Sequence, residues 1–117
     1  LIPLYLKNSS GNLIIANAGV EGQFESLQRW FSDVKEIDEK APIFIVATNS
    51  CSENAVNTQR FHEFADQNGC PFYEISNDMS NVNEVFTQIA VNVYNKYRQG
   101  PTELLITENN NKHCVIY

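Results

Sequence analysis

The feature that most constrains the fold is a repeated alternation between short apolar runs and longer segments with helical periodicity. The apolar runs are Leu13–Ala16 and Ile43–Ala47, and a third strand is predicted at Phe72–Ile75, which includes Glu74. Continuous apolar runs of this length are typical of strands that are buried on both faces. Strands that alternate with helices through short connections predict a parallel sheet with right-handed crossovers. The chain is therefore predicted to be an α/β protein.

Two of the predicted helices follow the first two strands. From Phe24 to Ile37, large apolar residues recur at steps of three and four, and Pro42 follows. A shorter helix is predicted from about 57 to 68, with Phe61 and neighbouring apolar residues facing inward. Gly69 supplies the left-handed position at which such a helix ends.

The third predicted helix has the strongest periodicity, with apolar residues at helical spacing from Val82 to Tyr97. Asn81 and Glu84 have the spacing of a capping box. Beyond Gly100 the periodicity is lost, so residues 99–117 are predicted to form a flexible polar tail, following a domain that spans residues 1–98.

Composition excludes several classes of protein. Of the 117 residues, 43% are apolar and 19% charged, which indicates one modest globular domain. A net charge of −6 argues against nucleic acid as a partner. Cys51, Cys70 and Cys114 lack zinc-site spacing, which predicts reduced thiols and a cytoplasmic location.

Three blocks of sequence resemble the Rab/Ras-type small GTPases in order and spacing: Leu1–Ser10, Phe24–Trp30 and Phe64–Ser76. The resemblance covers about residues 1–98. It implies the last three strand–helix units of a three-layer, parallel-sheet P-loop GTPase fold. The phosphate loop and both switches would lie upstream of Leu1, so the chain is expected to be a truncated or processed product.

The sequence allows a second register for the first strand. Asn17-Ala18-Gly19, followed by Gln23, loosely resembles the family's switch II. The register that treats Leu13–Ala18 as the family's fourth strand is favoured, because it aligns every later block without gaps.

The phosphate-binding signature of the family is missing. G-x-x-x-x-G-K-[ST] cradles phosphates with backbone N–H groups and a lysine. None of the five glycines precedes a lysine. No cofactor is therefore expected for this chain, and GTP or GDP with Mg²⁺ is expected only if a longer parent chain supplies the missing half. No residue is assigned a catalytic or metal-binding role.

The resemblance implies that guanine recognition would fall on two loops. The family's Asn-Lys-x-Asp corresponds to Thr48-Asn49-Ser50-Cys51. Cys51 cannot replace a carboxylate that accepts two hydrogen bonds from guanine, each worth about 1.5–3 kcal/mol. Asn49 is too short to cover the base as lysine does.

The family's Ser-Ala-Lys corresponds to Ser76-Asn77-Asp78. Asp78 places an anion where the family has a cation, and only Ser76 is kept. One interpretation is that these loops bind another base or metabolite. The favoured interpretation is that they are diverged loops that bind nothing. A receiver-like or flavodoxin-like module is the rival fold, but the acidic cluster of a receiver is missing.

Cys114-Val-Ile-Tyr117 has the form of a prenylation box. The resemblance implies lipidation there, which would hold the protein at the cytosolic face of endomembranes. Terminal Tyr117 is unusual in such a box, and Lys112 is the one nearby upstream cation. A single prenyl chain without a basic patch would bind a membrane only reversibly.

Three hypotheses of function remain. The first is a degenerate Rab-like GTPase fragment that neither binds nor hydrolyses GTP and keeps a surface for trafficking effectors or regulators. The second is the C-terminal part of a complete GTP-binding Rab-type enzyme in vesicle transport. In the third the chain has no independent role, because Leu13–Ala18 would be an exposed apolar edge that self-associates.

Overall fold

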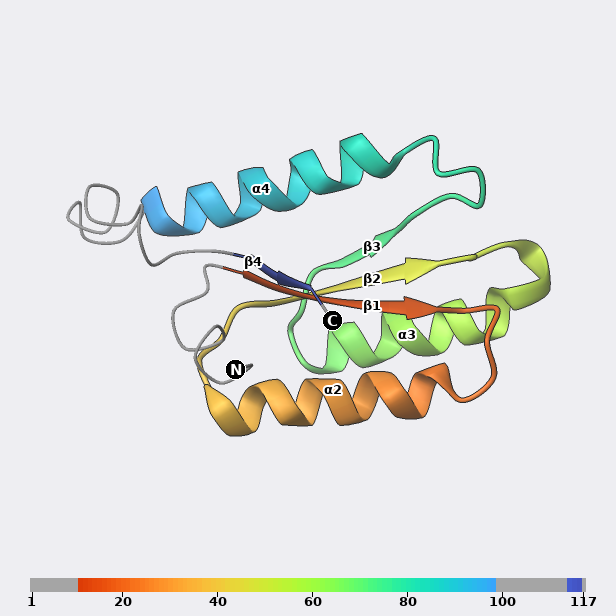
Figure 1. Ribbon diagram of the computed structural model, residues 1–117, viewed down its shortest axis with the longest axis horizontal. Coiled ribbons are helices and arrows are strands. Elements are labelled where there is room, and N and C mark those ends of the chain that lie inside the picture. Colours follow the sequence, from red (N-terminus) through yellow and green to blue (C-terminus); the bar gives the residue numbers. More distant parts are fainter. Residues whose placement is uncertain (1–10, 99–113, 117) are drawn as a thin grey trace.

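The computed structural model describes residues 11–98 and 114–116 (Figure 1). They form a parallel sheet of four strands in the order β3-β2-β1-β4. The strands are β1 (Gly11–Asn17), β2 (Ile43–Thr48), β3 (Phe72–Glu74) and β4 (Cys114–Ile116). The α/β prediction is confirmed, and Gly11–Asn17 lies in a strand as the favoured register requires.

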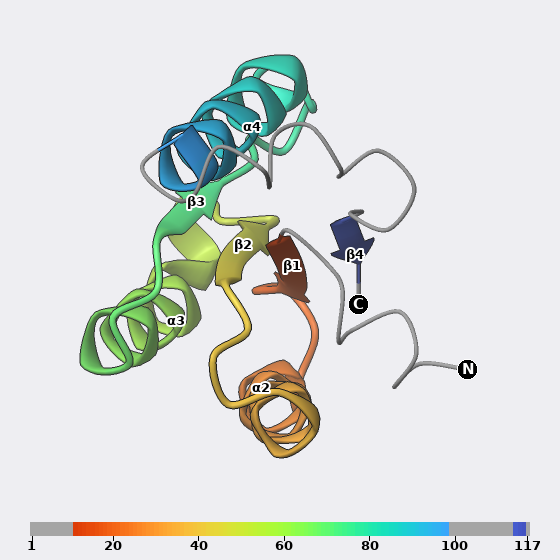
Figure 2. The same cartoon turned by 90° about the vertical axis from the view of Figure 1, so that its left-hand side faces the viewer.

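Helices lie on both faces of the sheet and make three layers (Figure 2). They are α2 (Gln23–Ile37), α3 (Ala55–Gln67) and α4 (Val82–Arg98). Helices α2 and α3 cover one face, and α4 lies over the other. A short 3₁₀ turn, η1 (Ser52–Asn54), leads into α3. The three predicted helices are therefore present, within about two residues of the expected bounds.

The buried core is divided by the sheet. Strand β2 is buried along nearly its whole length. Its successive side chains point to opposite faces of the sheet, and helices cover both faces. On the face of α2 and α3, Ile14 and Ile45 pack with Leu27 and Phe61. The opposite core joins the strands to α4, through Leu13, Phe44, Val46, Ile75, Val85 and Ile89.

Aromatic side chains join α2 to α3. Phe24 and Phe61 stack with ring centroids 6.3 Å apart, and Phe64 meets Phe24 and Phe31 edge-on at 5.9 and 5.3 Å. The guanidinium of Arg60 lies over the ring of Phe24, 4.2 Å from its centroid. Such contacts explain why apolar residues at helical spacing predicted both helices correctly.

Helix α3 ends as the sequence predicts. Gly69 has φ 67, a left-handed conformation that glycine adopts without steric cost. The Cys70 N–H donates to the Ala65 carbonyl and the Gly69 N–H donates to the Asp66 carbonyl. This pair of bonds is a Schellman motif, and it turns the chain back toward β3.

Two local expectations differ from the structure. Asn81 does not form the capping box expected with Glu84: its side-chain oxygen accepts a hydrogen bond from the Ser76 N–H at 2.8 Å and lies 3.0 Å from the Ser76 hydroxyl. The loop before α4 therefore takes the acceptor that the helix would have used.

The second difference concerns the edge of the sheet. Strand β4 comes from the segment expected to be a tail and pairs with β1 over Gly11–Leu13. The exposed edge is thus shorter than expected. Within residues 11–98 and 114–116, no strand pairs with Ile14–Asn17 on that side. The rest of 99–117 and residues 1–10 lie outside the described residues.

Candidate functional site: the loops at the carboxyl ends of the strands

The loops that follow β1, β2 and β3 meet at one end of the sheet (Figure 1). Parallel strands place their carboxyl ends at the same edge, which is where open α/β sheets bind ligands. The two predicted guanine loops both lie here, since Thr48 ends β2, residues 49–51 follow it, and Ser76–Asp78 follows β3. Both predicted loops therefore lie at the end of the sheet where open α/β folds bind ligands, and their binding role stays a prediction.

The loop after β2 is held by asparagine side chains. Asn49 has a left-handed backbone (φ 54), and its Nδ2 donates to Asn17 Oδ1 at 2.9 Å. Asn54 Nδ2 donates to the Asn49 carbonyl at 2.8 Å and lies 3.3 Å from Cys51 Sγ. Thr48 accepts a bond from the Ala18 N–H through its carbonyl. The loop is thus fixed by partners within the chain.

The loop after β1 joins the same network. Asn17 Oδ1 also accepts a hydrogen bond from the Gly19 N–H at 2.8 Å, and the Asn17 N–H donates to Gln23 Oε1. Asn57, on α3, donates to the Ala18 carbonyl at 2.9 Å. Sequence reasoning missed these residues, although asparagines that follow strands and begin helices are a usable signal for such loops.

The loop after β3 is organised around Ser76 and Asp78. The Ser76 hydroxyl donates to Asp78 Oδ1 at 2.9 Å, and the Ser80 N–H donates to the same oxygen at 3.0 Å. The Ser80 bonds and then the Ser76 bond hold the pKa of the Asp78 carboxyl below its usual value of 3.8. Asn77 is exposed in this turn. The loop therefore presents a carboxylate that is ionised at neutral pH.

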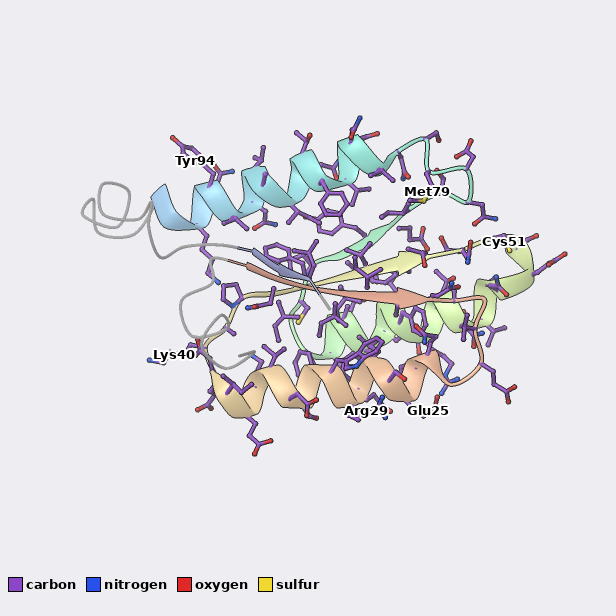
Figure 3. All side chains as sticks on the ribbon, viewed as in Figure 1. Glu25, Arg29, Lys40, Cys51, Met79 and Tyr94 are labelled. Atoms are coloured by element: carbon purple, nitrogen blue, oxygen red, sulfur yellow. The ribbon has the colours of Figure 1, made fainter. Side chains whose placement is uncertain are left out.

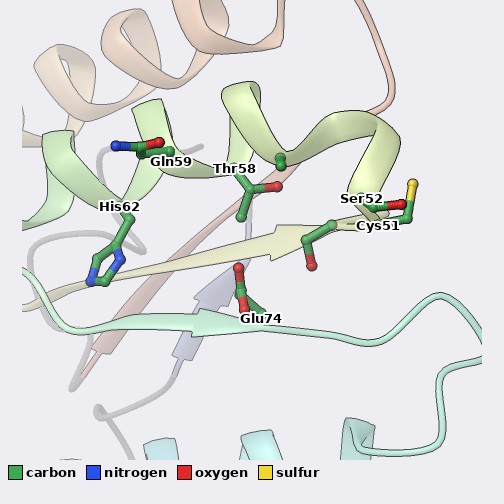
Figure 4. Close-up of a pocket in the computed structure, with 8 residues that line it drawn as sticks. Cys51, Ser52, Thr58, Gln59, His62 and Glu74 are labelled. Atoms are coloured by element: carbon green, nitrogen blue, oxygen red, sulfur yellow. The ribbon is translucent and has the colours of Figure 1, made fainter.

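A shallow depression lies beside the β2 loop, between α3 and β3 (Figure 4). Its volume is about 340 Å³, and it is lined by Ser50, Cys51, Ser52, Ala55, Thr58, Gln59, His62 and Glu74. Of the six predicted guanine-loop positions, only Cys51 lines it. The depression therefore does not bring the two predicted loops together.

Other chemistry has little support in the part of the chain that the structure describes. No group of three His, Cys, Asp or Glu side chains there could hold a metal ion. Burial raises the pKa of the Cys70 thiol, which disfavours a reactive thiolate. No described helix has the length and apolar character needed to cross a membrane.

Comparison with known proteins settles the family. The model of the Ras family matches residues 1–95. The chain belongs to the Ras family. This agrees with the three-layer fold and with the register in which β1, β2 and β3 are consecutive strands of the family's sheet.

Two curated members of the Ras family are similar over most of this chain. Ras-related protein Rab-5B of Plasmodium falciparum (isolate 3D7) is 22% identical over 101 residues, which are 85% of this chain and 49% of that protein. Ras-related protein Rab-2B of Dictyostelium discoideum is 28% identical over 111 residues, 92% of this chain and 54% of that protein. The chain thus spans about half the length of the curated relatives it matches.

The predicted roles of the loop residues stay predictions. The structure places Thr48 at the end of β2, Asn49 and Cys51 in the loop that follows, and the other three in a second loop at the same end of the sheet. Cys114 begins β4, and the tail segment before it lies outside the described residues. The resemblance to a Rab/Ras-type GTPase is confirmed.

Proposed function

We propose that this Ras-family chain neither binds nor hydrolyses guanine nucleotide by itself, and that it keeps a surface for Rab-type effectors or regulators. The observation that carries this proposal is that the polar groups of both candidate guanine loops bond to other groups of the same chain. A nucleotide would have to replace those bonds without the charged partners that the family supplies.

The β2 loop supports the proposal through Cys51. A thiol offers no pair of charged oxygens to the two donors on the guanine edge, and here it already lies against the Asn54 amide. The side chain of Asn49 is bonded to Asn17 and is too short to lie along a purine ring. Base discrimination would lose its strongest hydrogen bonds.

The β3 loop supports the proposal through its negative charge. Its carboxylate is held ionised by Ser80 and Ser76, so it is an anion at the pH of the cytosol. Carboxylates repel the electron-rich oxygen of guanine and the phosphates of a nucleotide. The hydroxyl of Ser76 has a single proton to donate and already lies 2.9 Å from Asp78 Oδ1 and 3.0 Å from Asn81 Oδ1.

The second candidate function is that of the C-terminal half of a complete GTP-binding Rab-type protein in vesicle transport. The share of the relatives that this chain spans favours it. A longer parent would then supply the loop for GTP or GDP and Mg²⁺. Prenylation of Cys114 would place such a protein at the cytosolic face of endomembranes, and mass spectrometry of native material would detect the lipid.

The first test is titration of the purified chain with fluorescent GDP in Mg²⁺. We expect no saturable binding at micromolar protein. The double variant Cys51→Asp with Asp78→Lys, which restores the family's charges at both loops, serves as a matched comparison. Saturable binding to the unaltered chain, competed by GTP and not by ATP, would show that both loops recognise guanine after all.

The retained partner surface needs its own test, because it is independent of nucleotide. Immobilised chain would be tested against purified Rab effectors and regulators, with and without GTP. Binding that is unchanged by GTP is expected. Binding that requires GTP would instead support the second candidate function.

A further inference from the structure

The last strand of the sheet is built from the residues of the candidate prenylation box. Strand β4 supplies three of the four residues of Cys114-Val-Ile-Tyr117. It pairs with Gly11–Leu13, on the side of β1 that faces away from β2 (Figure 2). The two aliphatic residues of the box, Val115 and Ile116, are also β-branched residues of the kind that strands favour. The same three residues therefore suit two different uses.

The two uses exclude each other. A prenyltransferase binds the last four residues of its substrate as a free C-terminal peptide. The Cys114 sulfur then loses its proton and bonds to the first carbon of an isoprenyl diphosphate, and inorganic diphosphate leaves with the electrons of the broken carbon–oxygen bond. A paired strand instead shares backbone hydrogen bonds with its neighbour. Residues 114–116 must therefore detach from β1 before the transferase can bind them.

We propose that the pairing of β4 with β1 withholds Cys114 from prenylation, so that release of this strand controls the modification. The proposal rests on the prenylation of Cys114 that belongs to the second candidate function. Because only chains with a released strand can react, the apparent efficiency of transfer falls in proportion to the released fraction.

Strand β4 is weak enough to be released while the rest of the sheet stays intact. It pairs with β1 over three residues, whereas β1 and β2 pair over six. Its pairing is parallel, which is slightly less stable per residue than antiparallel pairing. Local openings of this kind cost far less than global unfolding. A released state that makes up about 10% of the chains or less is therefore expected.

The coupling acts in both directions. A lipid that holds residues 114–116 at a membrane would uncover Gly11–Leu13, in addition to Ile14–Asn17, which β4 leaves open. Within the residues that the structure describes, the whole outer edge of β1 would then lack a partner strand. Prenylation therefore makes this edge available for strand pairing, and a strand that takes the edge promotes prenylation.

The experiment compares the kinetics of prenylation for three substrates with the same box. They are the full chain, a synthetic peptide of residues 108–117, and a full chain extended beyond Tyr117 by a glycine–serine linker and a second Cys-Val-Ile-Tyr. The extended chain is the matched control, because its reactive box lies outside β4 on the same folded domain. Purified farnesyl and geranylgeranyl transferases would be supplied with the labelled diphosphates.

We expect kcat/KM for the full chain to be about tenfold or more below that of the peptide, with the extended chain close to the peptide. The label reports on the box, because Cys51 and Cys70 are outside the last four residues and Cys51 lies at the far end of the sheet from β4 (Figure 3). Val115→Pro, made in chain and peptide, removes a backbone donor from the strand and should abolish their difference. Val115→Thr keeps the donor and the branched side chain, so it should preserve the difference.

The outcomes separate this proposal from the one on which it rests. A peptide that neither transferase modifies would exclude prenylation of this box, and the proposal with it. A peptide modified no faster than the full chain would overturn the proposal alone. So would an extended chain as slow as the full chain, which would mean that the folded domain obstructs the enzyme without any strand pairing.

Discussion

Single asparagine side chains hydrogen-bond segments that lie far apart in the sequence. Asn49 reaches Asn17 across 32 positions, and Asn57 reaches the Ala18 carbonyl across 39. The sequence located the strand ends correctly, and its interpretation of Cys51 and Asp78 as departures from the family stays a prediction. It could not predict the asparagine network, because those hydrogen bonds exist only once two strand ends and α3 have been brought together.

Asp78 gives a prediction at this scale. Its folded pKa lies below the usual 3.8, so the folded state binds fewer protons near that pH than the unfolded state. The resulting stability is fully present above about pH 4 and is lost as the pH falls through the folded value. The difference in melting temperature between the unaltered chain and Asp78→Asn should therefore shrink below about pH 4. Asp33→Asn, at an exposed carboxylate on α2, serves as the control. A difference that persists unchanged at pH 3 would contradict this account.

At the scale of elements, periodic burial made the helices predictable and local chemistry made one boundary predictable. Gly69 ended α3 as expected, because a left-handed residue is a property of a few neighbouring positions. The start of α4 at Val82 was predicted correctly, but the capping box of Asn81 with Glu84 was wrong. The side chain of Asn81 bonds to Ser76 instead, which depends on how β3 approaches the helix. Strand β4 was missed because a three-residue run can pair only once the rest of the sheet exists.

Gly69→Ala tests the end of α3. A side chain at this position meets no atom within 4 Å, so the cost comes from the left-handed backbone alone. We expect a loss of about 1–2 kcal/mol in the free energy of unfolding, measured with urea. Gly69→Asn should lose less, because asparagine tolerates this conformation. Equal losses for the two variants would mean that the backbone conformation is not the cause.

At the scale of the whole molecule, we expect the part of the β1 edge that no described strand covers to favour self-association at high concentration. The N–H groups of Asn12 and Ala18 point toward β2, so by alternation that of Ile15 points outward. Unpaired N–H and C=O groups of this kind can pair with a strand of another molecule, so we expect the chain to aggregate when it is concentrated.

Ile15→Lys tests that edge. A charge there should reduce aggregation on concentration, measured by light scattering, with a cost of about 1 kcal/mol in stability from lost packing. Val20→Lys adds the same charge at an exposed valine in the loop after β1 and should not protect. If both variants aggregate as the unaltered chain does, strand addition at β1 is not the cause.

Because β4 is short, the hydrogen bonds on the two sides of β1 should differ in how easily they open. β4 holds three residues whose partners lie about a hundred positions earlier in the chain, so its release requires far less disruption than separation of β1 from β2. Amide hydrogen exchange should therefore alternate along one strand. By the same alternation the Leu13 N–H faces β4, so it should exchange quickly, when β4 alone detaches. The Asn12 N–H donates to the Pro42 carbonyl, so it should exchange slowly, only when the sheet itself opens.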